Sequence, residues 1–263
     1  LASSAASDVY KRQLEYGGKT VPIYRDRPLN VFSDVDFIWT DEENENRRRL
    51  EYLGGEFRTR YGIDVSSFQG EIDWNAVADD NIDFAMVRVG FRGTGTGSLN
   101  TDKYYEQNIR GAMRAGLETG VYFFAQAVTV EEAIEEADYV ISLLDGLDIN
   151  GPVAYDWEMH DSTYRVYGTS PEMATACAVA FCQRIKDAGY TPMVYGGTYV
   201  TYMKYDQGAL ADYLSWYPEY KSEKSEKLCP TLVYHMDYWQ FSSSRAVAGI
   251  NGRVDMNIQF IRR

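Results

Sequence analysis

Short apolar runs alternate with helix-like segments from residue 61 onward, and this alternation restricts the fold more than any other feature. Repeated strand–helix alternation is typical of parallel β/α units. Because the expected strands are apolar on both faces, helices should cover them, and a closed barrel fits better than an open sheet. The pattern therefore predicts an α/β chain with an irregular, TIM-like (β/α) barrel.

The expected elements follow from this pattern. The strands are 62–65, 84–89, 121–124, 153–157, 192–195, 214–217 and 233–241, and the helices are 74–79, 104–115, 131–144, 171–188 and 202–213. A Gly-rich stretch, 93–97, has no helix directly after it, so we predict a mobile loop there rather than a phosphate cradle. Because no nucleotide-binding glycine motif opens a helix, nucleotide-binding α/β folds are disfavoured.

Residues 1–60 lack this alternation. We predict that they form an N-terminal extension or linker with one or two short strands, ahead of a barrel domain at 61–263. The opening segment, LASSAASDVYKRQ, has no apolar stretch of the kind found in signal peptides. We expect this segment to be a linker or a remnant of non-native sequence, so the missing signal says nothing about export.

The charge of the chain is acidic and unevenly distributed. The formal net charge is -13, and residues 61–263 hold 28 of the 39 acidic side chains but only 16 of the 26 basic ones. This balance argues against binding to nucleic acid or to an anionic membrane. No apolar run approaches the ~18 residues of a membrane span. The hydrophobic share of 45% is large enough for a substantial core.

Cysteine and histidine are scarce in the sequence. Cys177 and Cys182 lie in an expected helix at positions ~140° apart around its axis, so they should not pair. Whether Cys229 pairs with either of them stays open. The two histidines, His160 and His235, form no cluster with the cysteines. We therefore expect no metal site and no cofactor.

Two carboxylates end one of the expected strands. Asp156 and Glu158 follow the apolar run Val153-Ala154-Tyr155, two positions apart, so they should share one face of the strand. Like charges at this spacing raise each other's pKa, and apolar walls raise it further. One of the two acids could then stay protonated near neutral pH and act as a general acid. The alternative is that both carboxylates cap the next helix or meet an arginine.

Two further acids interrupt apolar strands. Asp64 breaks the first strand of the barrel, and Asp255 breaks the last one. Either could instead be an ordinary turn-forming aspartate. Polar aromatic and amide side chains fall at or near the strand ends as well: Tyr122, Tyr195, Trp216, Tyr217, Tyr220, Trp239 and Gln240. Carboxylates with tyrosine and tryptophan around them, and no metal ligands or Ser/His pair, describe a glycosidase.

The motifs of residues 61–260 resemble those of glycoside hydrolase family 25, the lysozymes (N-acetylmuramidases) of the Chalaropsis and cellosyl type. They occur in the order GIDVSSFQGEIDW, FAMVRVG, GVYFFA, DWE, MVYGG, YWQF and VDMN. This combination is specific and covers about three quarters of the chain, leaving residues 1–60 outside it. Phe68 departs from the family, which often has Trp or Tyr there, and Phe123 stands where His is common. These departures bear on the shape of the sugar subsites.

The resemblance implies cleavage of the β-1,4 bond between N-acetylmuramic acid and N-acetylglucosamine in peptidoglycan. It implies that Glu158 is the general acid and later the base, and that Asp156 orients or stabilises the substrate's 2-acetamido group or the developing cation. Asp64 and Asp255 would be supporting acids. The expected substrate-binding residues are Tyr122, Tyr195, Trp216, Trp239, Gln240 and Phe68. Peptidoglycan glycan strands would be the partner of a monomeric enzyme that is secreted or associated with the cell wall.

The stereochemical outcome and two other functions stay open. Strand positions two apart are separated by ~6.6 Å, between the carboxylate distances of retaining and inverting glycosidases. The resemblance favours retention assisted by the substrate's acetamido group. The alternative functions are a non-catalytic carbohydrate-binding relative, which should have lost a carboxylate, and a chitinase-like barrel enzyme, which should carry a longer acidic run than DWE.

Overall fold

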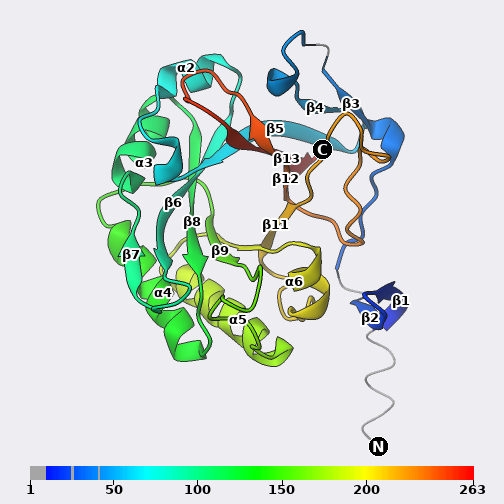
Figure 1. Ribbon diagram of the computed structural model, residues 1–263, viewed down its shortest axis with the longest axis vertical. Helices are drawn as coiled ribbons and strands as arrows, with labels where there is room; N and C mark the ends of the chain where they lie inside the picture. The colour runs from blue at the N-terminus through cyan, green and yellow to red at the C-terminus, as the bar shows by residue number, and fades with distance from the viewer. Residues whose placement is uncertain (1–9, 25–26, 41) are drawn as a thin grey trace, which may run out of the picture.

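The computed structural model describes residues 10–24, 27–40 and 42–263 of the chain. The first nine residues of the opening segment lie outside the described part. The core of the structure is a closed barrel of eight strands (Figure 1). These are β5 (Phe57–Val65), β6 (Phe84–Arg92), β8 (Glu118–Ala125), β9 (Val153–Trp157), β10 (Pro192–Tyr195), β11 (Leu214–Pro218), β12 (Tyr238–Arg245) and β13 (Val254–Arg262).

The barrel closes because β5 pairs with β6 on one side and with β13 on the other. Neighbouring strands run parallel except around β13, which is antiparallel to both β12 and β5. A short strand, β7 (Leu99–Thr101), extends the sheet beyond β6. The expected closed, irregular barrel is confirmed, and its irregularity lies in the reversed direction of the last strand.

Helices cover the outside of one half of the barrel (Figure 1). They are α2 (Trp74–Asp79), α3 (Tyr105–Arg114), α4 (Val130–Leu143), α5 (Pro171–Asp187) and α6 (Thr198–Met203). Two residues explain why α5 begins where it does: the Ser170 hydroxyl caps the helix, and Pro171 occupies its first turn. None of the described helices is both long and apolar enough to cross a membrane.

The helix α6 lies earlier in the chain than the 202–213 segment predicted from the sequence. It ends at Met203, and the following segment forms turns instead. The carboxylate of Asp206 accepts hydrogen bonds from the N–H groups of Gly208 and Ala209. An aspartate that bonds to the backbone ahead of it in this way competes with helix formation.

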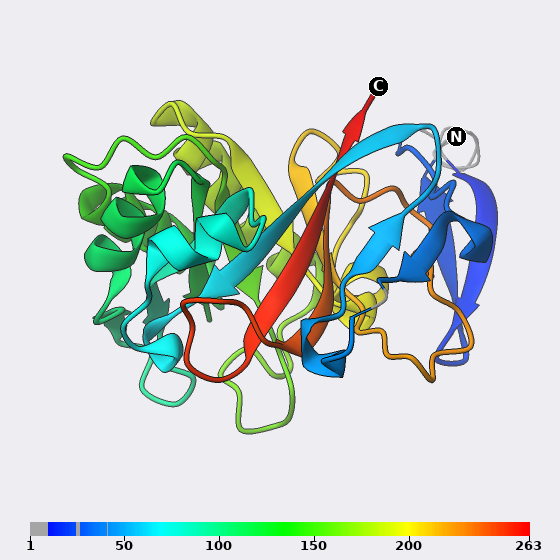
Figure 2. The same ribbon diagram turned by 90° about the horizontal axis from the view of Figure 1, so that it is seen from above.

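The N-terminal extension contains two β-hairpins, which is more regular structure than the one or two strands expected (Figure 2). β1 (Tyr10–Tyr16) pairs with β2 (Lys19–Tyr24), and β3 (Phe37–Trp39) pairs with β4 (Leu50–Tyr52). The first hairpin turns at Gly17 and Gly18, both with positive φ, as a two-residue hairpin turn requires. The structure also has three short 3-10 helices, η1 (Asp34–Asp36), η2 (Glu45–Arg47) and η3 (Ser67–Gln69).

The extension packs on the barrel through aromatic rings. Phe32 lies 4.4 Å from Phe260 of β13, measured between ring centroids, and 5.6 Å from Phe37. Tyr52 and Phe57 pack against the same group. We call these five residues the aromatic cluster. Because Phe57 is the first residue of β5, the extension continues without a break into the first barrel strand.

A cluster of apolar and aromatic side chains packs inside the barrel. These are Phe84, Met86, Ala154, Met193, Tyr195, Trp216 and Tyr238. A Cβ atom at Gly62 would lie 2.2 Å from the Phe84 ring, so this close packing requires glycine. The three cysteines are buried and free, in agreement with the expectation that Cys177 and Cys182 do not pair. Tyr195 and Trp216 of this cluster reach the carboxyl ends of the parallel strands, where the barrel is open.

Candidate active site

An open cavity of about 400 Å³ lies at the carboxyl ends of the parallel barrel strands, the end at which barrel enzymes place their sites. Its volume is in the range of small-molecule binding sites. The lining residues are Asp64, Ser66, Phe68, Gln69, Arg88, Tyr122, Phe124, Asp156, Glu158, His160, Tyr195, Trp216, Tyr220, Gln240 and Asp255. The structure thus brings together every residue that the sequence placed in the site, except Trp239.

Alternation along β9 places the acid pair in the cavity. Asp156 lines the cavity, whereas its neighbours Tyr155 and Trp157 are fully buried in the outer core. Glu158 follows the strand, and its side chain is 27% exposed, while Asp156 is only 6% exposed. Glu158 therefore reaches toward the open side of the cavity, above a more deeply buried Asp156. The Nε2 atom of His160 lies 3.2 Å from the carboxylate of Glu158.

The antiparallel pairing of β13 with β5 brings the other two acids together. Asp255 lies directly opposite Asp64 in the register of these strands. The side-chain amides of Asn257 and Gln240 each donate a hydrogen bond of 2.8 Å to the Asp64 carboxylate. Gln240 also donates to Asp255 at 3.3 Å.

Aromatic side chains hold both amides in the orientation that this network needs. The indole N–H of Trp216 donates to the Asn257 oxygen at 2.8 Å. The hydroxyls of Tyr195 and Tyr220 both donate to the Gln240 oxygen at 3.1 Å. Each amide oxygen is therefore occupied, and each amide N–H₂ group faces a carboxylate. Neutral donors therefore fix the carboxylates of Asp64 and Asp255, and they preorganise this pair without neutralising its charge.

The electrostatics of the cavity favour protonated acids. Burial raises the pKa of Asp64 to about 6, against the lowering effect of its hydrogen bonds from Asn257 and Gln240. Burial and the nearby carboxylates of Asp64 and Glu158 raise the pKa of Asp255 to about 8.

The pKa values of Asp156 and Glu158, at the end of β9, shift in the same direction. Burial, together with the nearby Glu158 carboxylate, raises the pKa of Asp156 well above its ordinary value. Burial also raises the pKa of Glu158, although His160 opposes this shift. All four acids thus have raised pKa values, a pattern that is typical of sites where carboxyl groups donate and accept protons.

Arg88 provides a positive charge inside the cavity. It comes from β6 and is held by Asp102, whose carboxylate is fully buried and accepts from the Arg88 guanidinium at 2.8–2.9 Å. The Arg88 guanidinium also lies 5.1 Å from the centre of the Phe68 ring, which is 84% exposed at the cavity rim. A ring this exposed is available for stacking on a sugar, as the sequence analysis expects for Phe68.

The structure corrects the expected position of Trp239. Its side chain is fully buried outside the barrel, where it packs on Phe37 of the extension at 5.4 Å and on Phe241. Side chains alternate across a strand, so Trp239 cannot share a face with Gln240. Because Gln240 points into the cavity, Trp239 must point away from it.

Six of the residues that line the cavity were not expected as site residues from the sequence: Ser66, Gln69, Arg88, Phe124, His160 and Tyr220. Arg88 interrupts an apolar strand, which is the signal that identified Asp64 and could have identified Arg88. His160 follows Glu158 by two positions but lies beyond the strand, where alternation gives no guidance. Tyr220 was noted near a strand end, but only the structure shows its bond to Gln240.

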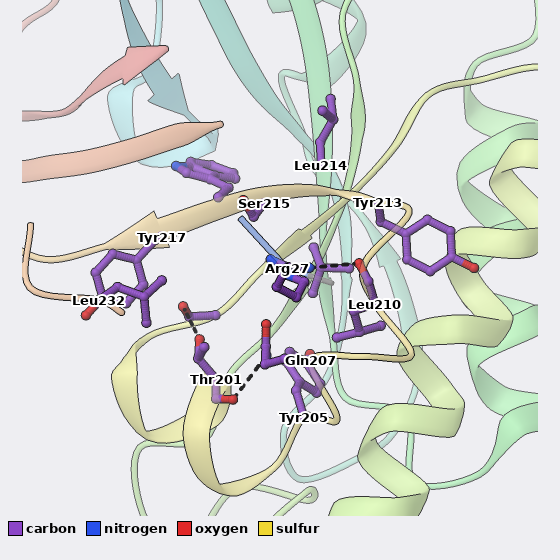
Figure 3. Close-up of a pocket in the computed structure, with 13 residues that line it drawn as sticks. Arg27, Thr201, Tyr205, Gln207, Leu210, Tyr213, Leu214, Ser215, Tyr217 and Leu232 are labelled. Carbon is purple, nitrogen blue, oxygen red and sulfur yellow. Dashed lines mark hydrogen bonds between the residues drawn. The ribbon is translucent and has the colours of Figure 1, made fainter. Parts of the chain in front are cut away.

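A second cavity lies on the outer side of β10 and β11 (Figure 3). It measures about 30 Å³, enough for a water molecule. Arg27 of the extension reaches into it and donates to the Leu210 carbonyl at 3.0 Å. No carboxylate is among the described residues that line it. This small space is a packing gap between the extension and the barrel, and the acidic cavity is the candidate active site.

The barrel and its carboxylate cluster define a glycoside hydrolase. The chain belongs to glycosyl hydrolases family 25, whose sequence pattern matches residues 63–250. It is 26% identical over 197 residues to an autolytic lysozyme of Clostridium acetobutylicum, covering 74% of this chain and 54% of that protein. It is 27% identical over 201 residues to Lysozyme M1 of Streptomyces globisporus, covering 74% of this chain and 66% of the relative. The chain therefore spans about half to two thirds of these relatives.

Solved structures share the fold. The bacterial lysozyme from Streptomyces coelicolor superposes with a TM-score of 0.61 and 25% identity, covering 75% of this chain and 90% of that one. The modular autolysin LytC from Streptococcus pneumoniae gives a TM-score of 0.66 at 24% identity, covering 94% of this chain and 57% of that chain. The higher coverage of this chain by LytC means that its alignment reaches into residues 1–60.

Proposed function

We propose that this protein hydrolyses the β-1,4 bond between N-acetylmuramic acid and N-acetylglucosamine in peptidoglycan. The observation that carries the proposal is the pair Asp156 and Glu158 in an open, aromatic-walled cavity with two further carboxylates. The relatives support it: two are named as lysozymes, and LytC has been solved with a synthetic peptidoglycan ligand.

In the proposed mechanism Glu158 donates a proton to the glycosidic oxygen as the bond breaks. Its carboxyl group is the more exposed member of the pair, so it is the one that can reach a bond in the open cavity. Its raised pKa favours the protonated form that a general acid needs. After the leaving group departs, the same residue takes a proton from the water that attacks the sugar.

Asp156 is proposed to act on the substrate's 2-acetamido group. The acetamido oxygen attacks the anomeric carbon as the leaving group departs, and Asp156 accepts a hydrogen bond from the acetamido N–H. We propose that the two acids share one proton before substrate binds, because two buried like charges cannot both ionise easily. Hydrogen bonding of Asp156 to the N–H group favours its ionised form, which leaves the shared proton on Glu158. Two displacements at one carbon retain the anomeric configuration.

The test is a comparison of Glu158→Gln with the unaltered protein on purified cell walls. The variant keeps the size of the side chain, but its amide has no acidic proton to donate. We expect at least ~10²-fold slower loss of turbidity, the usual contribution of a general acid, with unchanged circular dichroism. Mass spectrometry of the released fragments should show muramic acid at the reducing end. Near-normal lysis by the variant, or reducing-end glucosamine, would contradict the assignment.

The stereochemistry has its own readout. NMR spectra of freshly released product should show the β anomer first, and an initial α anomer would rule out the acetamido-assisted route. Since peptidoglycan lies outside the cytoplasmic membrane, we further propose that the protein acts as a secreted or wall-associated monomer. The non-catalytic alternative predicts binding to walls with no fragments released.

A further inference from the structure

The connection between β11 and β12, residues 219–237, contributes Tyr220 to the wall of the acidic cavity and contains no helix. Tyr220 lies at its start and is 53% exposed, yet the Tyr220 hydroxyl reaches the buried Gln240 oxygen at 3.1 Å. Through Gln240 this contact continues to the Asp64 carboxylate. The shape of the cavity therefore depends on what holds this connection in place.

The N-terminal extension holds residues 230–233, the far part of the connection, by hydrogen bonds to their backbone carbonyls. The Asn30 side-chain amide donates hydrogen bonds of 2.8 Å to the carbonyls of both Pro230 and Leu232. The Asn30 backbone N–H donates to the Val233 carbonyl at 2.9 Å. With these three hydrogen bonds to consecutive parts of its backbone, residues 230–233 have little freedom to move away from the extension.

A second group of contacts lies on either side of this point. The backbone N–H groups of Leu228 and Cys229 donate to the Asp34 carboxylate at 3.1 and 3.4 Å. The backbone N–H of His235 donates to the Pro28 carbonyl at 2.8 Å. The extension thus provides the hydrogen-bond partners that a strand or helix would provide in a regular β/α unit.

Trp239 joins the extension to the near part of the connection. Its ring packs edge-on against Phe37, and its indole N–H donates to the carbonyl of Glu219 at 3.0 Å. Glu219 directly precedes Tyr220. The residue expected to bind sugar thus lies behind the cavity wall, between the extension and the residue that forms the wall.

We propose that residues 28–39 of the extension are a positioning element for the active site, which fixes the 219–237 connection and so sets Tyr220 and its bond to Gln240. The family pattern begins at residue 63, so this role belongs to a part of the chain outside it. The expected effect on sugar binding rests on the proposed function, but the effect on the connection itself does not.

The test compares Asn30→Asp with Arg49→Met in the full chain. Asn30→Asp keeps the acceptor for the Phe32 N–H and the backbone bond to Val233, but it removes both side-chain hydrogen bonds to the connection. Arg49→Met is the matched control, because Arg49 anchors the extension to Asp80 and the Asn81 carbonyl at the end of α2, away from the connection. Hydrogen–deuterium exchange and wall-lysis kinetics are measured for both.

We expect amides of residues 219–237 to exchange roughly tenfold faster in Asn30→Asp and to be unaffected in Arg49→Met. Losing two hydrogen bonds should raise KM for cell walls about 5- to 20-fold, with kcat changed less than about twofold. In a Tyr220→Phe background, Asn30→Asp should add little to KM, because its effect passes through that hydroxyl.

Two results would overturn the proposal. One is faster exchange confined to the extension in Asn30→Asp. The other is equal changes of KM in the two variants at equal loss of thermal stability, which would show a general effect on folding. If the unaltered protein releases no fragments from walls, the proposed function fails, whereas the exchange experiment still decides whether the extension positions the connection.

Discussion

Replacing Asp255 by asparagine should make the protein more stable as the pH rises from 4 to 7, relative to the unaltered chain. In the unfolded chain Asp255 ionises near 3.8, whereas in the folded cavity its pKa is about 8. A raised carboxyl pKa gives a contribution to stability that is complete below the unfolded pKa and falls as the pH rises toward the folded one. Asparagine cannot ionise, so the variant escapes this loss.

The size of the effect follows from the shift. Each pH unit between the two pKa values costs about 1.4 kcal/mol, so a single isolated group would lose about 4 kcal/mol between pH 4 and pH 7. Asp255 is only partly buried, and Asp64 and Glu158 take up part of the change in charge. We therefore expect a swing of about 2 kcal/mol in the free energy of unfolding, or about 4–8 °C in Tm.

Thermal unfolding at several pH values between 4 and 8, followed by circular dichroism, measures this swing. Asp212→Asn is the control, because it removes an exposed carboxylate outside the cavity and so reports the effect of net charge alone. Lysis by Asp255→Asn should fall even though its stability rises. If the curves of Asp255→Asn and the unaltered protein stay parallel across this range, the raised pKa of Asp255 is wrong.

Two further predictions concern groups behind the cavity. Arg92→Met should destabilise the protein by about 3–5 kcal/mol at pH 8, because it leaves the buried carboxylate of Glu136 without its partner at 2.7 Å. Because burial raises the pKa of Glu136 to about 7, the loss of stability in Arg92→Met should be smaller at pH 5 than at pH 8. Urea unfolding at both pH values measures the two losses, and equal losses would contradict this prediction. Gln126→Leu should leave the Glu158 carbonyl unpaired, costing about 1–3 kcal/mol, and slow lysis by misplacing Glu158. Normal kinetics in a variant of lowered Tm would show that Gln126 is only structural.

The sequence was informative about the site where local rules apply. Alternation along a strand is enough to place Asp156 and Glu158 on one face, and the structure has both in the cavity. The same rule applied to the YWQF motif separates Trp239 from Gln240, so the error at Trp239 came from reading the motif as a block. The direct pairing of Asp64 with Asp255 depends on a long-range antiparallel register, which no local pattern encodes.

The same distinction between local and long-range effects explains which parts of the fold the sequence predicted. The barrel was predictable because each β/α unit repeats a local pattern over about 200 residues. The boundary of α6 was not, because one side chain, Asp206, turns the backbone at a point where the apolar spacing continues. The sequence predicted one or two short strands in the extension but not their pairing into two hairpins, because partners such as Phe260, which packs on Tyr52 of β4, lie far along the chain.

The reversed last strand also determines when the enzyme can become active during its synthesis. The Asn257 amide that holds Asp64 lies 193 residues further along the chain. Until β13 has been made, both β5 and β12 lack a partner along one edge, and the barrel stays open. Closing a loop of this length is a slow, late step of folding. A ribosome-bound chain therefore carries Glu158 long before it carries the assembled site, which would keep the proposed activity silent until β13 has been made.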